Sequence, residues 1–155
     1  MLPQFSLDWV AKQTNVFLIR EPARVIASYE QKRETLALED LGFVQQKRIY
    51  DYCVALGQKP IVIDSDDILS NPKVALIALC EGVGIDFDPA MLRWEAGARL
   101  EDGVWASHWY DAVHKSTGFG AAPGPIPVVG SKFNDILEQA QVIYRQLGAQ
   151  KQGAQ

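Results

Sequence analysis

Two residues near the start of the chain, Arg20 and Ser28, have the types and the spacing of an anion-binding pair. The planar guanidinium of an arginine donates paired hydrogen bonds to a phosphate-like group, and a serine hydroxyl can donate one more. Arg20 directly follows the apolar run Val16–Ile19, which predicts a strand buried on both faces of a parallel sheet. Because ligands of open α/β sheets bind beyond the carboxyl ends of the strands, Arg20 stands where a ligand is expected.

A helix is predicted directly after this strand. Pro22 is suited to the first helical position, where its missing N–H costs nothing, and apolar residues then recur at helical spacing as Val25, Ile26 and Tyr29. Ser28 lies two turns into this helix, near Arg24. The alternative interpretation is structural: Glu21 pairs with Arg20, and Ser28 bonds to its own helix.

The order of these residues resembles a known family. Arg20 and Ser28, eight positions apart across an Arg-Glu-Pro turn, resemble the 3′-phosphate motif of the sulfotransferases that use 3′-phosphoadenosine 5′-phosphosulfate (PAPS). The segments FLIREPARVIASY, PIVIDSDDILSNP and DGVWASHWYDAVHKSTGF are similar to a bacterial sulfotransferase-like branch, and the resemblance covers most of residues 3–119.

The resemblance implies an α/β fold of the P-loop-NTPase type, in which helices flank a parallel sheet. It implies sulfuryl transfer from PAPS to a hydroxyl or amine, with no metal. Arg20 and Ser28 are then the residues that hold the 3′-phosphate of PAPS or of adenosine 3′,5′-bisphosphate. Arg99 supplies a further cation from a later loop. The implied partner is a nucleotide-type small molecule.

Two parts of such an enzyme are not found in these residues. Family members cradle the phosphosulfate with a loop of small residues and carry a catalytic histidine just before the segment that resembles LPQF. We therefore expect a C-terminal portion of the fold, without the cradle-bearing part, that is inactive as this chain. His108 and His114 are candidates for a replacement base, or they pack against Trp105, Trp109 and Tyr110. The alternative function is a non-catalytic binding or assembly module.

Composition excludes several other classes. The 155 residues carry a net charge of −4, which does not favour binding to nucleic acid. No apolar run approaches the ~20 residues that span a bilayer, so no membrane is expected and a cytoplasmic location is predicted. Cys53 and Cys80 are predicted to be buried free thiols. The acidic run at residues 64–67 indicates either a metal site or, more commonly, a turn that caps a helix.

The remaining pattern sets the predicted organisation. Strands are expected at 60–64 and, weakly, at 126–129; helices are expected at 39–56, ending at Gly57, at 71–84, ending at Gly84, and around 89–92. The core extends over 1–119, a Pro/Gly linker over 120–130, a terminal helix over 131–148 and a frayed tail over 149–155. So few strands leave unpaired edges, from which we expect a homo-oligomer.

Overall fold

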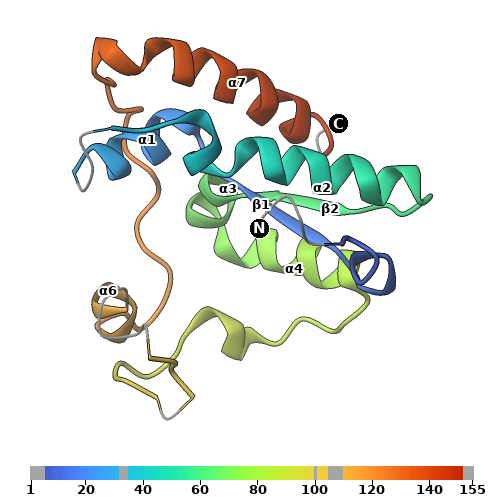
Figure 1. Cartoon of the computed structure of the whole chain (residues 1–155). Coiled ribbons are helices and arrows are strands. Elements are labelled where there is room, and N and C mark those ends of the chain that lie inside the picture. The colour runs from blue at the N-terminus through green and yellow to red at the C-terminus, as the bar shows by residue number, and fades with distance from the viewer. Residues whose placement is uncertain (1–5, 32–34, 100, 105–109, 152–155) are drawn as a thin grey trace. The chain divides into compact units, whose positions relative to one another are not determined.

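The computed structural model describes residues 6–31, 35–99, 101–104 and 110–151. The chain divides into two compact units, of which the first consists of residues 1–67 and 124–155 and the second of residues 68–123. The first unit holds the sheet and three of the longer helices (Figure 1). None of the helices in the described ranges is long and apolar enough to cross a membrane.

The sheet of the first unit is a parallel pair of short strands. β1 (Val16–Ile19) lies beside β2 (Ile61–Asp64), with Val16 opposite Ile61 and Ile19 opposite Asp64. Both predicted strands are confirmed, and their parallel pairing places Arg20 and the residues after Asp64 at one edge of the sheet.

β1 is covered on one face only. Phe17 and Ile19 are buried, whereas Val16 and Leu18 are 41% and 54% exposed. The expectation that this strand is buried on both faces is therefore wrong. The face that carries Val16 and Leu18 is therefore open, and in the part of the chain that the structure describes β1 also has one unpaired edge, because it pairs with β2 alone.

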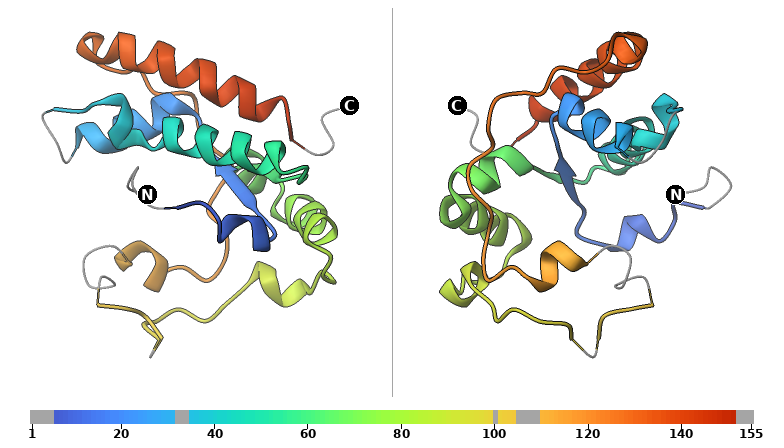
Figure 2. Two further views of the ribbon diagram at one scale, coloured as in Figure 1. Left: turned by 45° about the vertical axis from the view of Figure 1, so that its right-hand side comes forward. Right: turned by 90° about the vertical axis from the view of Figure 1, so that its left-hand side faces the viewer.

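Two long helices supply the cover for the buried face. α2 (Phe43–Ala55) and α7 (Asn134–Gly148) lie side by side in Figures 1 and 2, and α7 also contacts both strands. The buried residues of this core come from the strands, the two helices and the preceding single-turn helix η1 (Val10–Lys12): Val10, Phe17, Ile19, Cys53, Val62 and Leu147. The start of the chain and its C-terminal helix are thus packed into one core.

A second, smaller core joins α1 (Pro22–Glu30) to the start of α7. Ala23 and Ile26 of α1 are buried against Val129 and Phe133, the latter in the single-turn helix η4 (Ser131–Phe133). α1 is therefore held from two directions, by the strand before it and by α7.

Sequence signals for helix ends are confirmed at two glycines. Gly57 and Gly84 both have a φ of +77°, the left-handed conformation that glycine adopts without steric cost. The predicted helix over 39–56 is divided, because Gly42 also has positive φ and separates the single turn η2 (Leu38–Leu41) from α2.

The described residues of the second unit include α4 (Pro72–Val83), η3 (Pro89–Leu92) and α6 (Asp111–His114). Asn71 caps α4 by accepting a hydrogen bond from the N–H of Val74 (3.3 Å), as the Asn-Pro pair predicts. The short helix α3 (Ser65–Ser70) follows β2 directly and leads from the first unit into the second. Both cysteines are buried free thiols, as predicted.

The weakly predicted strand at 126–129 does not form. Residues 124–130 form no strand, and Val128 is almost fully exposed. Pro125 and Pro127 explain the difference, since neither has an N–H to donate to a neighbouring strand.

Candidate functional site

The candidate anchor begins at Arg20, the first residue beyond β1. The side chain of Arg20 is exposed and makes no ion pair or hydrogen bond with any described residue. An unpaired arginine at the carboxyl end of a parallel strand has its full set of donors available for an anion from solvent.

The neighbouring carboxylate, Glu21, does not neutralise this cation. Glu21 is buried, and its Oε1 accepts hydrogen bonds from the N–H of Ala23 (3.3 Å) and from Nε2 of Gln141 on α7. Glu21 thus caps α1 and ties it to α7. The alternative interpretation, in which Glu21 pairs with Arg20, is contradicted by these contacts.

Ser28 lies on the exposed side of α1, one helical turn after Arg24. Its hydroxyl has no hydrogen-bond partner in the described ranges. From Pro22 to Ser28 the helix advances about 9 Å along its axis. Arg20 and Ser28 therefore flank the first two turns of α1 without touching each other.

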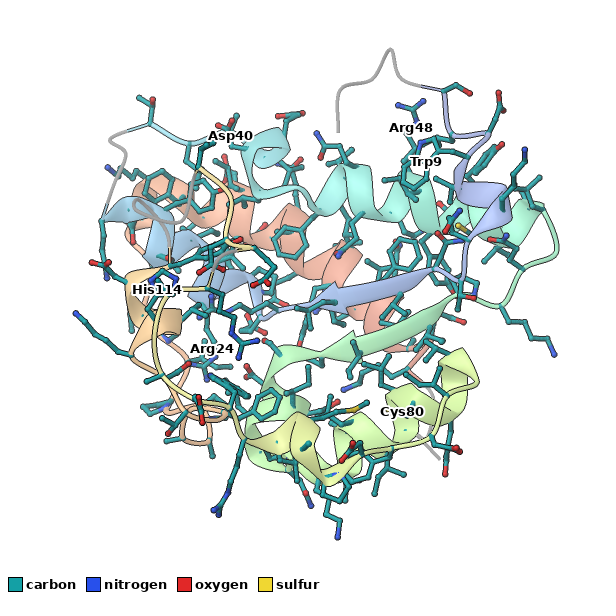
Figure 3. All side chains as sticks on the ribbon, turned by 90° about the horizontal axis from the view of Figure 1, so that it is seen from below. Trp9, Arg24, Asp40, Arg48, Cys80 and His114 are labelled. Carbon is teal, nitrogen blue, oxygen red and sulfur yellow. The ribbon has the colours of Figure 1, made fainter. Side chains whose placement is uncertain are left out.

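Arg24, between them, is fully engaged (labelled in Figure 3). Its Nε lies 3.2 Å from Oδ2 of Asp66, and its terminal nitrogens donate to the carbonyl oxygens of Gly124 (2.5 Å) and Pro125 (3.5 Å). Arg24 therefore fixes α1 to the start of α3 and to the segment that leads to α7. It thus holds the helix that carries Ser28 in place, and its own guanidinium is already bonded to Asp66 and two carbonyl oxygens instead of to an anion from solvent.

An acidic cluster of Asp64, Asp66 and Asp67 follows β2 at the same end of the sheet as Arg20, and Asp64 is its buried member. Asp64, the last residue of β2, is 2% exposed; its Oδ2 accepts a hydrogen bond from the hydroxyl of Tyr144 on α7 (2.6 Å). Its Oδ1 accepts the N–H of Asp66 (3.0 Å), which is the predicted helix cap. Burial and the hydrogen bond to Asp64 raise the pKa of Tyr144 well above its ordinary value.

Lys151 supplies a second positive charge to this cluster, besides Arg24, which pairs with Asp66. Nζ of Lys151 lies 2.7 Å from Asp67 and 3.9 Å from Asp64. Each carboxylate of the cluster thus has a partner, so the acidic run is structural. No group of metal-ligating side chains occurs in the described ranges.

The second unit brings together two other residues that the sequence singles out. Arg99 and His114 both line a pocket of about 640 Å³. Between them lies Asp102, whose Oδ2 is 2.8 Å from the backbone N of Arg99 and 2.7 Å from Nε2 of His114. These two donors hold the pKa of Asp102 below its usual value.

His114 also packs edge-on against the ring of Tyr110, with ring centroids 5.9 Å apart. One of the predicted packing contacts of His114 is therefore confirmed. Its other candidate partners, Trp105 and Trp109, and the second candidate base, His108, lie outside the described residues. The structure describes Arg99 with the second unit and Arg20 and Ser28 with the first, so the role of Arg99 at the phosphate anchor stays a prediction.

Comparison with known families shows to which protein family the chain belongs. The sequence model described as "Sulfotransferase domain" matches residues 1–151, which is nearly the whole chain. The chain belongs to the sulfotransferase domain family. The resemblance seen in Arg20, Ser28 and the later segments is confirmed at the level of the family, and the observed fold is a mixed α/β fold with a small parallel sheet.

Two curated relatives are similar over most of this chain. They are named branched-chain-amino-acid aminotransferase-like proteins 2 and 1, both from Arabidopsis thaliana, and are 37% and 36% identical over 140 residues. The match covers 88% of this chain but 24% of each relative, so this sulfotransferase-family chain spans about a quarter of their length. No solved structure matches the chain.

Several residues of this family member were not predicted from sequence. Tyr144 meets Asp64 across 80 positions, and Gln141 meets Glu21 across 120. Nothing local in the sequence marks such pairs, because the contact exists only once α7 has packed on the sheet.

Proposed function

We propose that this chain supplies the 3′-phosphate anchor of a sulfotransferase that uses PAPS. The observation that carries the proposal is Arg20, which is exposed at the carboxyl end of β1 and has no partner among the described residues, while the carboxylate of the adjacent Glu21 is hydrogen-bonded to Ala23 and Gln141. Membership of the sulfotransferase domain family supports it. When bound, PAPS supplies an activated sulfuryl group for transfer to an acceptor.

The chain's own residues then act as follows. The guanidinium of Arg20 donates two hydrogen bonds to phosphate oxygens, and the hydroxyl of Ser28 donates a third from the next turns of α1. Arg24 keeps α1 in place through Asp66 and two backbone carbonyls. The residues fit a phosphate group, since the nearby acidic side chains are already paired and leave the charge of Arg20 uncancelled.

No residue is assigned to the phosphosulfate. In the part of the chain that is described, no glycine-rich loop joins a strand to a helix, and sulfuryl transfer depends on such preorganised donors. The proposal therefore concerns cofactor binding, and the acceptor is left open.

Binding of adenosine 3′,5′-bisphosphate tests the anchor. This nucleotide should bind more tightly than adenosine 5′-monophosphate in titration calorimetry, because only the former carries the 3′-phosphate. Arg20→Ala should weaken its binding roughly tenfold or more, since a charge-assisted contact is lost, and Ser28→Ala roughly three- to tenfold.

Arg48→Ala provides the matched control, because Arg48 is an exposed arginine of the same unit, in the middle of α2. It should bind like the unchanged protein. Equal affinity for the two nucleotides, or equal losses of affinity in Arg20→Ala and Arg48→Ala, would contradict the assignment of Arg20 and Ser28 to the 3′-phosphate.

We also infer that the chain self-associates through the open edge of β1. Among the described residues β1 has one paired strand, and on its other edge the carbonyl oxygen of Leu18 accepts a side-chain hydrogen bond from Nε2 of Gln46 (2.8 Å). An edge without a paired strand invites pairing with another chain. Light scattering across a concentration series should give at least a dimer. Leu18→Lys should shift the chain toward monomer, because a charge at an exposed edge opposes pairing. A monomer at every concentration contradicts this inference.

A further inference from the structure

The second unit contains a pocket that the anchor does not use. It has a volume of about 890 Å³ and lies between the start of α4, the end of η3 and residues 115–119. Small-molecule sites typically occupy about 300–1,000 Å³, so the pocket has the size of a ligand site.

One wall of this pocket is held by backbone pairing between two distant segments. The N–H of Trp94 donates to the carbonyl oxygen of Thr117 (3.2 Å), and Arg93 forms an antiparallel bridge with Gly118. A Cβ at position 118 would lie 3.2 Å from the carbonyl oxygen of Leu92, so a side chain there would crowd the backbone and glycine favours this close approach. Backbone hydrogen bonding therefore fixes this wall of the pocket.

Two aromatic rings are fixed in the same wall. Nε1 of Trp94 donates to Oγ of Ser116 (2.9 Å), whose hydroxyl donates in turn to the carbonyl oxygen of Val113 (2.6 Å). Phe119 packs edge-on against the indole, with ring centroids 5.5 Å apart. With its N–H satisfied, the indole of Trp94 presents an apolar surface to the pocket.

All charged side chains among the described lining residues of the pocket are positive. Lys73, Arg93 and Lys115 line it, all three are exposed, and none forms an ion pair with a described residue. No acidic residue is among the described lining residues, although the chain as a whole carries a net charge of −4. Unpaired cations around one concavity raise its positive potential and attract an anion.

We propose that this pocket binds a small aromatic anion, with its acidic group facing Lys73, Arg93 and Lys115 and its ring against Trp94 and Phe119. The size, the fixed rings and the unbalanced positive charge together select such a molecule over a neutral ring or a bare inorganic anion. This proposal goes beyond the cofactor anchor and does not depend on it, because none of the pocket residues belongs to the first unit.

Three probes separate the contributions to binding: phenyl phosphate carries both ring and charge, phenol the ring alone, and inorganic phosphate the charge alone. In calorimetry on the full chain, phenyl phosphate should bind roughly tenfold more tightly than either of the other two, because ring contacts and charge contacts add. If inorganic phosphate or phenol binds as well as phenyl phosphate, or if no probe binds, the proposal is wrong.

Variants locate the binding site. Arg93→Ala combined with Lys115→Ala should weaken phenyl phosphate binding at least tenfold, because two cationic donors are removed. Both side chains are exposed, so circular dichroism should show an unchanged fold. Lys59→Ala removes an exposed lysine of the first unit and should change nothing.

Equal binding by the double variant and the unchanged chain would overturn the assignment. Loss of phenyl phosphate binding in Arg20→Ala would overturn it too, because the anion would then sit at the anchor of the first unit. Retained phenyl phosphate binding in Arg20→Ala, with loss in the double variant, supports a separate site. The proposed 3′-phosphate site of the first unit is tested separately, by the binding of adenosine 3′,5′-bisphosphate.

Discussion

Leu147→Ala should lower the free energy of unfolding by about 2–5 kcal/mol, measured by urea denaturation. The side chain of Leu147 is 0% exposed and packs with Phe17, Ile19 and Val62 of the two strands. Truncation loses the transfer free energy of the side chain and leaves a cavity. Since natural domains are stable by about 5–15 kcal/mol, a change of this size removes a large share of the stability.

Val142→Ala is the matched control for this prediction. Val142 lies on the same helix, α7, but is 46% exposed, so its truncation should change the free energy of unfolding far less, by about 0.5 kcal/mol. Similar effects at Val142 and Leu147 would contradict the packing of α7 against the sheet. That packing matters for the proposed function, because α7 holds the residues on either side of the Arg20 anchor.

The sequence predicts local features of the fold well. The apolar run Val16–Ile19 is the observed β1, and the Asn-Pro pair and Gly84 bound the observed α4. These signals depend on conformational preferences within a few residues, so they survive folding unchanged. Gly57 ends a helix for the same reason.

Burial is harder to predict from the same residues. A continuous apolar run indicates cover on both faces, yet Val16 and Leu18 are exposed because cover depends on which strands and helices arrive from elsewhere. The weakly predicted strand near Val128 fails on a local ground, since the prolines beside it remove N–H donors.

The candidate site likewise has features that local sequence predicts and features that depend on tertiary contacts. The place of Arg20 could be predicted, because it follows from the strand that ends just before it. The freedom of its guanidinium could not, since that depends on Glu21 turning toward Gln141 of α7. The pairing of Asp102 with His114 is likewise a tertiary contact, formed between a loop residue and the last residue of α6.

Tyr144→Phe should lower the free energy of unfolding by about 1.5–3 kcal/mol at neutral pH. The substitution keeps the ring but removes the hydroxyl that donates to the buried carboxylate of Asp64 (2.6 Å). That carboxylate would keep the N–H of Asp66 and the more distant Lys151, and would lose its shortest hydrogen bond. Tyr110→Phe, at an exposed tyrosine of the second unit, should have little effect.

The stability contributed by this hydroxyl should decrease at alkaline pH. Folding raises the pKa of Tyr144, so the protonated hydroxyl stabilises the folded chain fully below the unfolded pKa of about 10. Above that pH the unfolded chain loses the proton first, and the advantage of tyrosine over phenylalanine should shrink by at most about 1.4 kcal/mol per pH unit. Urea denaturation of both proteins between pH 8 and 11 measures this difference, in which the other tyrosines cancel because both chains share them. Curves that stay parallel across this range would show that the proton of Tyr144 does not bind α7 to the strand end.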